Sequence, residues 1–173
     1  MQFDFEIDKL TCSLEDTQTG ATLLTEILPL EKGDFKIISK NLGWKFNWRI
    51  EVIAPEKQVY KLILQKEPKV IQGLICLEKK SDHVFMSLIE AAPHNLGKIK
   101  KYFGVAGNLV AFGCKLSFEY GFEGCIAFDS KTALISHYEL TLGAKLLFGQ
   151  RMEINTVAAI KLVNQYYPEF LKN

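Results

Sequence analysis

The feature that most constrains the fold of this chain is an apolar, strand-like run followed by a small-residue loop and an apolar helix. The run is VFMSLIEA, residues 84–91, and the loop and helix lie in KYFGVAGNLVAF, residues 101–112. Gly104, Ala106 and Gly107 place small side chains where this helix begins. The first N–H groups of a helix have no acceptor within it and point outward at the positive end of the helix dipole. The pattern therefore predicts a binding site for a phosphate or pyrophosphate, and with it a nucleotide-like cofactor.

The remaining sequence alternates between extended and helical patterns. The expected strands are residues 10–14, 22–28, 44–54, 60–65, 70–78, 84–91, 125–128 and 144–155. The expected helices are residues 30–42, 105–120, 130–142 and 156–167. An early antiparallel meander followed by alternating helices and strands predicts an α+β (mixed α/β) fold, with a mixed antiparallel and parallel central sheet flanked by helices.

The chain shows no internal repeat, low-complexity segment or linker, so we expect one domain over residues 1–173. We divide it into an N-terminal hairpin extension (1–29), a core (30–155) and a C-terminal helix (156–173). A chain of this length can bury a full hydrophobic core.

Composition and charge exclude several classes of protein. Apolar residues make up 48% and charged residues 24% of the 173 residues, which fits neither a disordered nor a membrane-embedded chain. The formal net charge of +1 gives no basic excess for tracking nucleic acid. The acidic first ten residues lack the pattern of a signal peptide, and no apolar run is long enough for a membrane span. We expect a cytoplasmic protein with no nucleic-acid or membrane partner.

The four cysteines are far apart in the sequence and form no CxxC pair. Cys76, Cys114 and Cys125 lie in apolar surroundings, which is typical of reduced, buried thiols. We therefore assign no metal site to this chain.

Three segments in order resemble the GNAT superfamily of acyl-CoA N-acyltransferases. Residues 101–106 have the spacing of its cofactor loop, with Lys101 where the family usually has Gln or Arg. Residues 87–95, SLIEAAPHN, are similar to the strand end that precedes that loop, and residues 137–144, HYELTLGA, to a later segment that carries a tyrosine. The resemblance implies a GNAT-like fold over residues 30–155 and acetyl-CoA (coenzyme A) as cofactor.

The resemblance also implies which residues hold the cofactor. Backbone N–H groups of residues 105–109 would bind the pyrophosphate; the alternative is a small-residue turn that serves only close packing of the helix on the sheet. The basic cluster KIKK at residues 98–101 is by default a solvated loop, and the alternative is that it faces the phosphates of coenzyme A. The residues expected at the cofactor are Ile89, Ala91, Lys101, Gly104, Val105, Ala106, Gly107, Asn108 and Leu109.

Glu90 and Tyr138 are the catalytic residues that the resemblance implies. Glu90 would deprotonate the attacking amine, directly or through water; the alternative is a carboxylate with a structural partner. Tyr138 would reprotonate the departing thiolate, because its hydroxyl is a proton donor at neutral pH; the alternative is a core aromatic. His94 is a second candidate base, although its loop position favours a solvent-facing side chain. Bulky Trp44, Phe46 and Trp48 are expected mainly in the core, with the acceptor pocket wall as the alternative.

The expected function is acyl-CoA-dependent N-acyl transfer, with acetyl passing from acetyl-CoA to a primary amine by direct attack. The acceptor, a small molecule or a peptide amine, stays open, as does the oligomeric state, with a homodimer as one option. Two alternatives to an enzyme are also open. One is a catalytically inactive module that keeps the cofactor site, and the other is an interaction protein that docks through residues 1–29.

Overall fold

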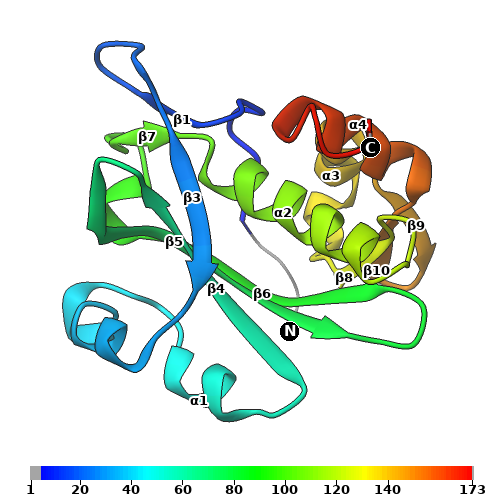
Figure 1. Ribbon diagram of the computed structural model, residues 1–173, viewed down its shortest axis with the longest axis horizontal. Helices are drawn as coiled ribbons and strands as arrows, with labels where there is room; N and C mark the ends of the chain where they lie inside the picture. The colour runs from blue at the N-terminus through cyan, green and yellow to red at the C-terminus, as the bar shows by residue number, and fades with distance from the viewer. Residues whose placement is uncertain (1–4, 173) are drawn as a thin grey trace.

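The structure, a computed structural model, describes residues 5–172 and is built on one long mixed sheet (Figure 1). In the described residues the strand order is β3-β4-β5-β6-β8-β10-β9. These strands are β3 (Thr25–Pro29), β4 (Lys57–Leu64), β5 (Glu67–Lys79), β6 (Val84–Ala91), β8 (Ile126–Asp129), β9 (Lys145–Phe148) and β10 (Arg151–Ile154). Neighbouring strands are antiparallel except β6 and β8, which are parallel. The sheet is therefore mixed, with its one change of direction at the β6–β8 pair.

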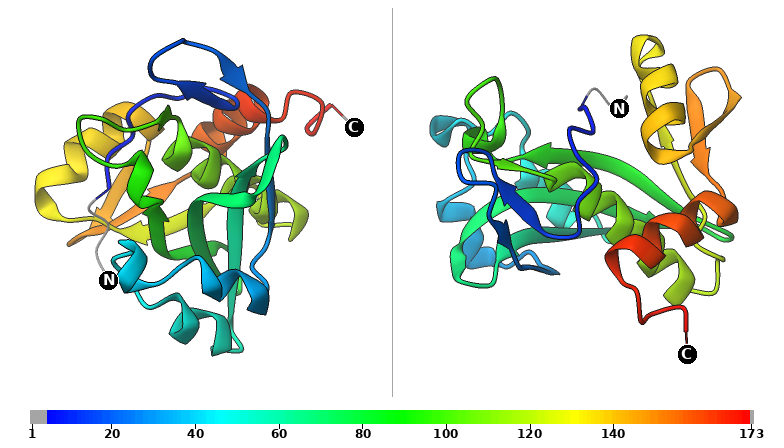
Figure 2. Two further views of the ribbon diagram at one scale, coloured as in Figure 1. Left: turned by 90° about the vertical axis from the view of Figure 1, so that its left-hand side faces the viewer. Right: turned by 90° about the horizontal axis from the view of Figure 1, so that it is seen from above.

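Helices cover both faces of the sheet (Figures 1 and 2). One face carries α2 (Val105–Glu119), α3 (Ile135–Leu142) and α4 (Thr156–Tyr166), whose apolar side chains join the larger core cluster. The other face carries α1 (Trp48–Ile53), and its smaller cluster includes Trp44, Trp48 and Leu88. Two separate cores thus hold the sheet between them, and we call the two sides the α2 face and the α1 face.

A bulge in β6 decides which of its side chains reach each face. Cys76 of β5 pairs with Leu88 and the next residue, Leu77, pairs with Met86, so Ser87 is an extra residue in β6. Such an insertion reverses the alternation of side chains beyond it. Met86 therefore joins the core of the α2 face, and so does Ile89, three residues on. Glu90, one residue later, is turned to the α1 face.

β6 and β8 pair only at their beginnings within the described chain. The register joins Val84 to Ile126 and Phe85 to Ala127. Beyond Phe85 the described residues of β6 have no pairing with β8 and continue to Ala91. The strands separate there, and the opening lies beside α2 and α3.

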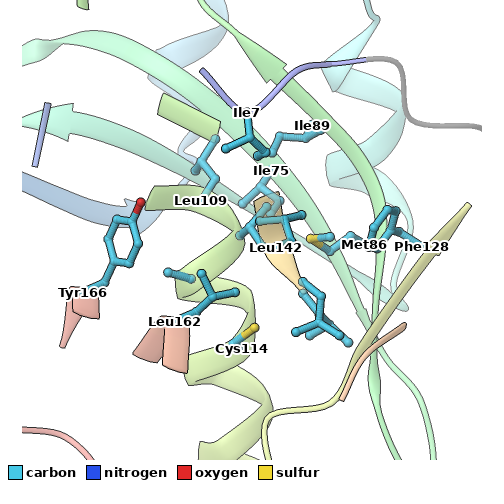
Figure 3. Packing of buried hydrophobic residues seen from close by; sticks show 14 of the residues in the cluster. Ile7, Ile75, Met86, Ile89, Leu109, Cys114, Phe128, Leu142, Leu162 and Tyr166 are labelled. Carbon is cyan, nitrogen blue, oxygen red and sulfur yellow. The ribbon is translucent and has the colours of Figure 1, made fainter. Parts of the chain in front are cut away.

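Residues 5–9 lie across this opening. The N-terminal segment descends between α3 and the start of α2, most clearly in the right-hand view of Figure 2. Ile7 is 7% exposed and belongs to the core of the α2 face. Figure 3 shows it beside Ile89 of β6 and Leu109 of α2. The segment thus lies on the α2 face and contacts both α3 and the start of α2.

The structure corrects the expected N-terminal extension and the first expected strands. The hairpin consists of β1 (Leu14–Asp16) and β2 (Thr22–Leu23), and β1 also pairs with β7 (Tyr102–Phe103) in a small second sheet. β3, which we had placed in the extension, instead pairs with β4 at the edge of the central sheet. The extension therefore ends before residue 25.

Two further expectations between residues 30 and 54 are wrong. The expected helix 30–42 consists of two short 3-10 turns, Lys32–Lys36 and Lys40–Leu42, because the backbone of Ser39 between them is extended. The expected strand 44–54 is an irregular loop followed by α1. Trp44 and Trp48 are buried against the sheet and Phe46 is partly buried, and this spacing of aromatic residues mimics the pattern of a strand.

The second half of the chain follows the expected order more closely. The helix expected over 105–120 is α2, and the extended run 144–155 is a hairpin of β9 and β10. α3 is preceded by a 3-10 turn, Thr132–Leu134. Asn155, rather than Thr156, caps α4, since its Oδ1 accepts the N–H of Ala158 at 3.1 Å.

Candidate functional site

The start of α2 has the geometry that its small residues predict. Gly104 precedes the helix with φ at 102°, a left-handed conformation that side chains disfavour. A Cβ there would lie 2.9 Å from Thr11 Cγ2 and 3.1 Å from the Ser13 carbonyl oxygen. The N–H of Asn108 already donates to the Gly104 carbonyl at 3.1 Å. The N–H groups of residues 105–107 precede this bond and have no acceptor within the helix, so they are unpaired donors of the helix start.

A cavity of about 260 Å³ opens beside this helix end. Five of the expected cofactor residues line it: Ile89, Ala91, Val105, Ala106 and Leu109. The structure thus brings the end of β6 and the start of α2 to one space. The opposite wall includes residues from the N-terminal segment: Phe5, Glu6 and Asp8.

Asp8 places an anion on this helix end. Its Oδ1 accepts the N–H of Gly104 at 3.1 Å, and its Oδ2 lies 3.0 Å from the Nζ of Lys100. A carboxylate with a backbone donor and an ammonium is chemically close to a bound phosphate oxygen. The residues at this position therefore fit an anionic cofactor group.

Lys100, rather than Lys101, is the lysine at the cavity. Lys101 lies outside the cavity, and its backbone is held by His94 and Thr17: its N–H donates to the His94 carbonyl at 2.9 Å, and its carbonyl accepts the N–H of Thr17 at 3.1 Å. The two neighbours in KIKK therefore differ in role, since one holds the loop and the other faces the anion.

Glu90 is enclosed on the α1 face by the loop that leads into α1. Its Oε2 accepts the N–H of Lys45 at 2.5 Å, and its Oε1 accepts the N–H of Phe46 at 3.2 Å and the indole N–H of Trp48 at 2.9 Å. The side chain is buried, and the residue is 6% exposed. These donors come from one short segment, as the structural alternative for Glu90 requires. The catalytic role of Glu90 stays a prediction.

Tyr138 lies in the core of the α2 face with its hydroxyl directed at the N-terminal segment. The hydroxyl donates to the carbonyl of Phe5, and the ring packs edge-on against Phe128 with centroids 5.3 Å apart. The neighbouring His137 accepts the N–H of Ile7 on its Nε2 at 2.9 Å. The tyrosine is thus a core residue whose hydroxyl donates a hydrogen bond to the N-terminal segment.

Gly107 and Asn108 have packing roles as well. A Cβ on Gly107 would lie 2.5 Å from the Tyr166 hydroxyl and 3.1 Å from Leu10 Cδ2, so this glycine allows α4 to approach α2. The side-chain amide of Asn108 donates to the carbonyls of Gly104, Thr11 and Ser13 at 2.8, 3.2 and 3.1 Å. The small-residue loop therefore serves close packing and presents free N–H groups at the same time.

His94 is exposed, as its loop position suggested, and one ring nitrogen lies 2.8 Å from Gln72 Oε1. Partial burial and the charge of Lys101 lower its pKa from the ordinary 6.5. Its neighbour Asn95 is buried and bonds the Gln72 carbonyl at 3.1 Å and the Tyr102 N–H at 3.2 Å. This cluster fixes the loop that carries Lys100.

Asp8, Ile7 and Phe5 were not among the residues expected at the site. Asp8 and Gly104 are separated by 96 positions, so no periodicity or motif joins them. In the sequence, the acidic residues of this segment argue only against a signal peptide. Only the tertiary structure shows that one of these carboxylates reaches the start of α2.

Solved structures with the same fold are N-acetyltransferases. A chimera of the spermidine N-acetyltransferase SpeG from Vibrio cholerae and hSSAT matches with a TM-score of 0.56 and 18% identity, over 79% of this chain and 98% of that chain. The spermidine N-acetyltransferase from Vibrio cholerae in complex with CoA and spermine matches with a TM-score of 0.54 and 17% identity, over the same shares. No family model and no curated protein sequence matches the chain. The expected GNAT-like mixed fold is thereby confirmed.

Two surveys of the described residues bear on other classes of site. No helix within residues 5–172 is both long and apolar enough to traverse a lipid bilayer. Over the same residues, His, Cys, Asp and Glu side chains do not gather in threes in a way that could hold a metal ion.

Proposed function

We propose that this protein is an acyl-CoA-dependent N-acetyltransferase that transfers acetyl to a primary amine. The observation that carries the proposal is the start of α2, where an anion already lies on a backbone N–H and a lysine beside a cavity. The fold shared with N-acetyltransferases supports the same activity. When bound, acetyl-CoA would supply the acyl group as an activated thioester.

The chain's own groups divide into binding and proton-transfer roles. The N–H groups of Gly104 and residues 105–107, with Lys100, would hold the pyrophosphate. Ile89, Ala91 and Leu109 would line the space beside it. The Tyr138 hydroxyl, which already donates toward the opening, would protonate the leaving sulfur.

Glu90 is the proposed general base from the resemblance, and its contacts support a positioning role in addition. Its carboxylate holds residues 45–48 against the end of β6, one residue from Ile89 and Ala91 at the cavity. It would reach an amine only through a water molecule or after the 45–48 loop moves. A substitution test therefore has to separate loss of turnover from loss of fold.

The proposed acceptor is a small-molecule amine, and polyamines come first because a neighbour with this fold was solved with CoA and spermine. Thiol release from acetyl-CoA, measured over spermidine, spermine, simple diamines and lysine-containing peptides, tests the proposal. Tyr138→Phe should reduce turnover about 100-fold or more while CoA affinity changes little. Turnover by the variant at the wild-type rate would remove the tyrosine from the mechanism, and no thiol release with any amine would overturn the enzyme proposal.

The second candidate function is a CoA-binding module without catalysis. It is favoured by Glu90, whose carboxylate is already engaged by three donors. CoA binding by calorimetry, together with the absence of thiol release, would select it. The cytoplasmic location, the homodimer and the single-domain organisation stay predictions.

A further inference from the structure

Residues 5–9, which we call the strap, connect α3 to the start of α2. At α3, Phe5 accepts the Tyr138 hydroxyl and Ile7 donates its N–H to His137 at 2.9 Å. At α2, Asp8 accepts the N–H of Gly104 at 3.1 Å. Between these contacts the Ile7 side chain is buried in the core of the α2 face, beside Ile89 and Leu109 (Figure 3). The strap thus closes the opening between β6 and β8 from one side to the other.

Two strap residues, Asp8 and Phe5, are bonded to groups that the proposed function needs. The Gly104 N–H and Lys100, which would hold the pyrophosphate, are bonded to Asp8. The Tyr138 hydroxyl, which would protonate the sulfur, is bonded to Phe5. Phe5, Glu6 and Asp8 also form one wall of the cavity that Ile89 and Ala91 line.

We propose that the strap is an autoinhibitory segment that occupies the acyl-CoA site, with Asp8 taking the place of a phosphate group. This inference rests on the proposed function. Strap and cofactor exclude each other, so the cofactor binds only to molecules in which the strap has left its groove.

The strap is built to leave without unfolding the rest of the chain. It forms no strand in the structure, and Glu6, Asp8 and Lys9 are exposed. The side chains of the Asp8–Lys100 pair are 20% and 24% exposed, so water can replace their contacts. The following residues are held separately: Asn108 bonds the carbonyls of Thr11 and Ser13, and Leu14 is buried in β1. Release can therefore stop at residue 10.

If the strap must leave before the cofactor binds, the apparent affinity equals the intrinsic affinity multiplied by the fraction of molecules in which the strap is open. Substitutions that weaken the strap should therefore tighten CoA binding. Asp8→Asn keeps the shape and removes the charge, and we expect CoA to bind about three- to tenfold more tightly, since two partly exposed charged contacts are weakened. Part of that gain could arise simply because a negative charge has left the neighbourhood of an anion. Ile7→Ala separates the two causes, because it is neutral and weakens only the packing of the strap.

The experiment measures CoA binding by calorimetry and hydrogen–deuterium exchange of the peptide that covers the strap. The proteins are the wild-type chain, Asp8→Asn, Ile7→Ala and the control Asp82→Asn, which removes the charge of an exposed carboxylate that is paired with the neighbouring His83. We expect tighter binding by both strap variants and unchanged binding by the control. In the wild-type chain, saturating CoA should increase exchange at Ile7 and its neighbours while residues 105–119 become more protected.

The outcomes separate the inference from the proposed function. If CoA binds all four proteins equally and strap exchange stays slow, the strap does not compete, and the inference fails while the cofactor site stands. If Asp8→Asn alone binds more tightly and exchange is unchanged, the effect is electrostatic and the inference also fails. If no protein binds CoA at millimolar concentration, the proposed function fails, and the inference fails with it. The exchange measurement on the wild-type chain decides the case even if Ile7→Ala does not fold.

Discussion

The two faces of the central sheet are each closed by a carboxylate that accepts backbone N–H groups, but the two closures differ in kind. On the α1 face, Glu90 projects from β6 itself and accepts two backbone N–H groups and an indole N–H. On the α2 face, Asp8 comes from the N-terminal strap and accepts the N–H of Gly104, with Lys100 beside it. Glu90 is 6% exposed, whereas the Asp8 side chain is 20% exposed.

This difference indicates which face can be opened. Removing a buried, fully engaged carboxylate leaves several donors without acceptors, which costs more than the same change where water can enter. The α1 face is therefore permanent structure, and the α2 face is closed by an exchangeable contact. The proposed cofactor site lies at the second kind of closure.

The largest expected effect is on stability and tests the permanence of the α1 face. Glu90→Gln should lower the free energy of unfolding by about 2–4 kcal/mol, because an amide group would replace an acceptor that faces three donors. Asp8→Asn should lower it by about 1 kcal/mol or less. Urea unfolding of both variants provides the measurement, with Glu119→Gln, an exposed carboxylate on α2, as control. A stable Glu90→Gln protein without turnover would instead favour the general base.

The next effect tests how closely α4 packs on the start of α2. Gly107→Ala should destabilise the protein by about 1–3 kcal/mol, because the new Cβ would meet the Tyr166 hydroxyl at 2.5 Å. Gly33→Ala is the matched control on the α1 face, since a Cβ there has nothing within 4 Å, and it should change stability by less than about 0.5 kcal/mol. Thermal unfolding compares the two, and Tyr166→Phe should relieve part of the Gly107→Ala loss. Equal melting temperatures for the two alanine variants would contradict the packing role.

A smaller effect is the pH dependence of stability that His94 contributes in the loop that carries Lys100. The pKa of His94 is lowered in the folded chain by partial burial and by Lys101, with an opposing influence of Glu67. Below its ordinary pKa of 6.5 the unfolded chain binds the proton more readily, so the stability linked to His94 is present above that pH and is lost as pH falls. His94→Gln should unfold with a flatter pH dependence between pH 7 and 5. Parallel curves for wild type and variant would show that His94 contributes nothing.

The last prediction concerns the rates at which the cysteine thiols are chemically modified, and it involves no change in stability. Cys12, just beyond the strap, is exposed, whereas Cys76 and Cys114 are buried. Burial raises the pKa of Cys76 to about 12 and also raises that of Cys114, so neither forms a thiolate readily. A thiol reagent at pH 8 should modify Cys12 first in the native protein, and Cys12→Ser should remove that fast phase. Rapid modification of Cys114 would mean that the core of the α2 face opens.

Local chemistry allowed much of the α2 face to be predicted. The small residues at 104–107 predicted a helix that begins with free N–H groups, and that helix is α2. Ile89, Ala91, Val105, Ala106 and Leu109 meet at one cavity because a strand and the helix that follows it stay neighbours in space. These interactions join residues that are close in the sequence, so they can be predicted from the sequence pattern alone.

The α1 face was predicted less well because the conformation of its segments depends on contacts between residues far apart in the sequence. The 44–54 segment shows bulky residues at alternate positions, yet it forms a loop and α1 once Trp44 and Trp48 pack on the sheet. Glu90 was expected to deprotonate the attacking amine, and alternation alone cannot say on which face of the sheet its side chain lies. The extra residue Ser87 reverses the alternation in β6, and only pairing with β5 reveals it.

The sequence by itself thus determined that this chain presents an anion-binding helix end after an apolar strand in a mixed sheet, because these features follow from neighbouring residues. The tertiary structure alone decided that Glu90 is enclosed on the far face and that Asp8 lies on that helix end. Both depend on pairings that no local pattern encodes: a one-residue bulge set by β5, and a contact across 96 positions of the chain. The position of a carboxylate in a fold is set by which backbone donors reach it, and those donors are assembled only when the whole chain has folded.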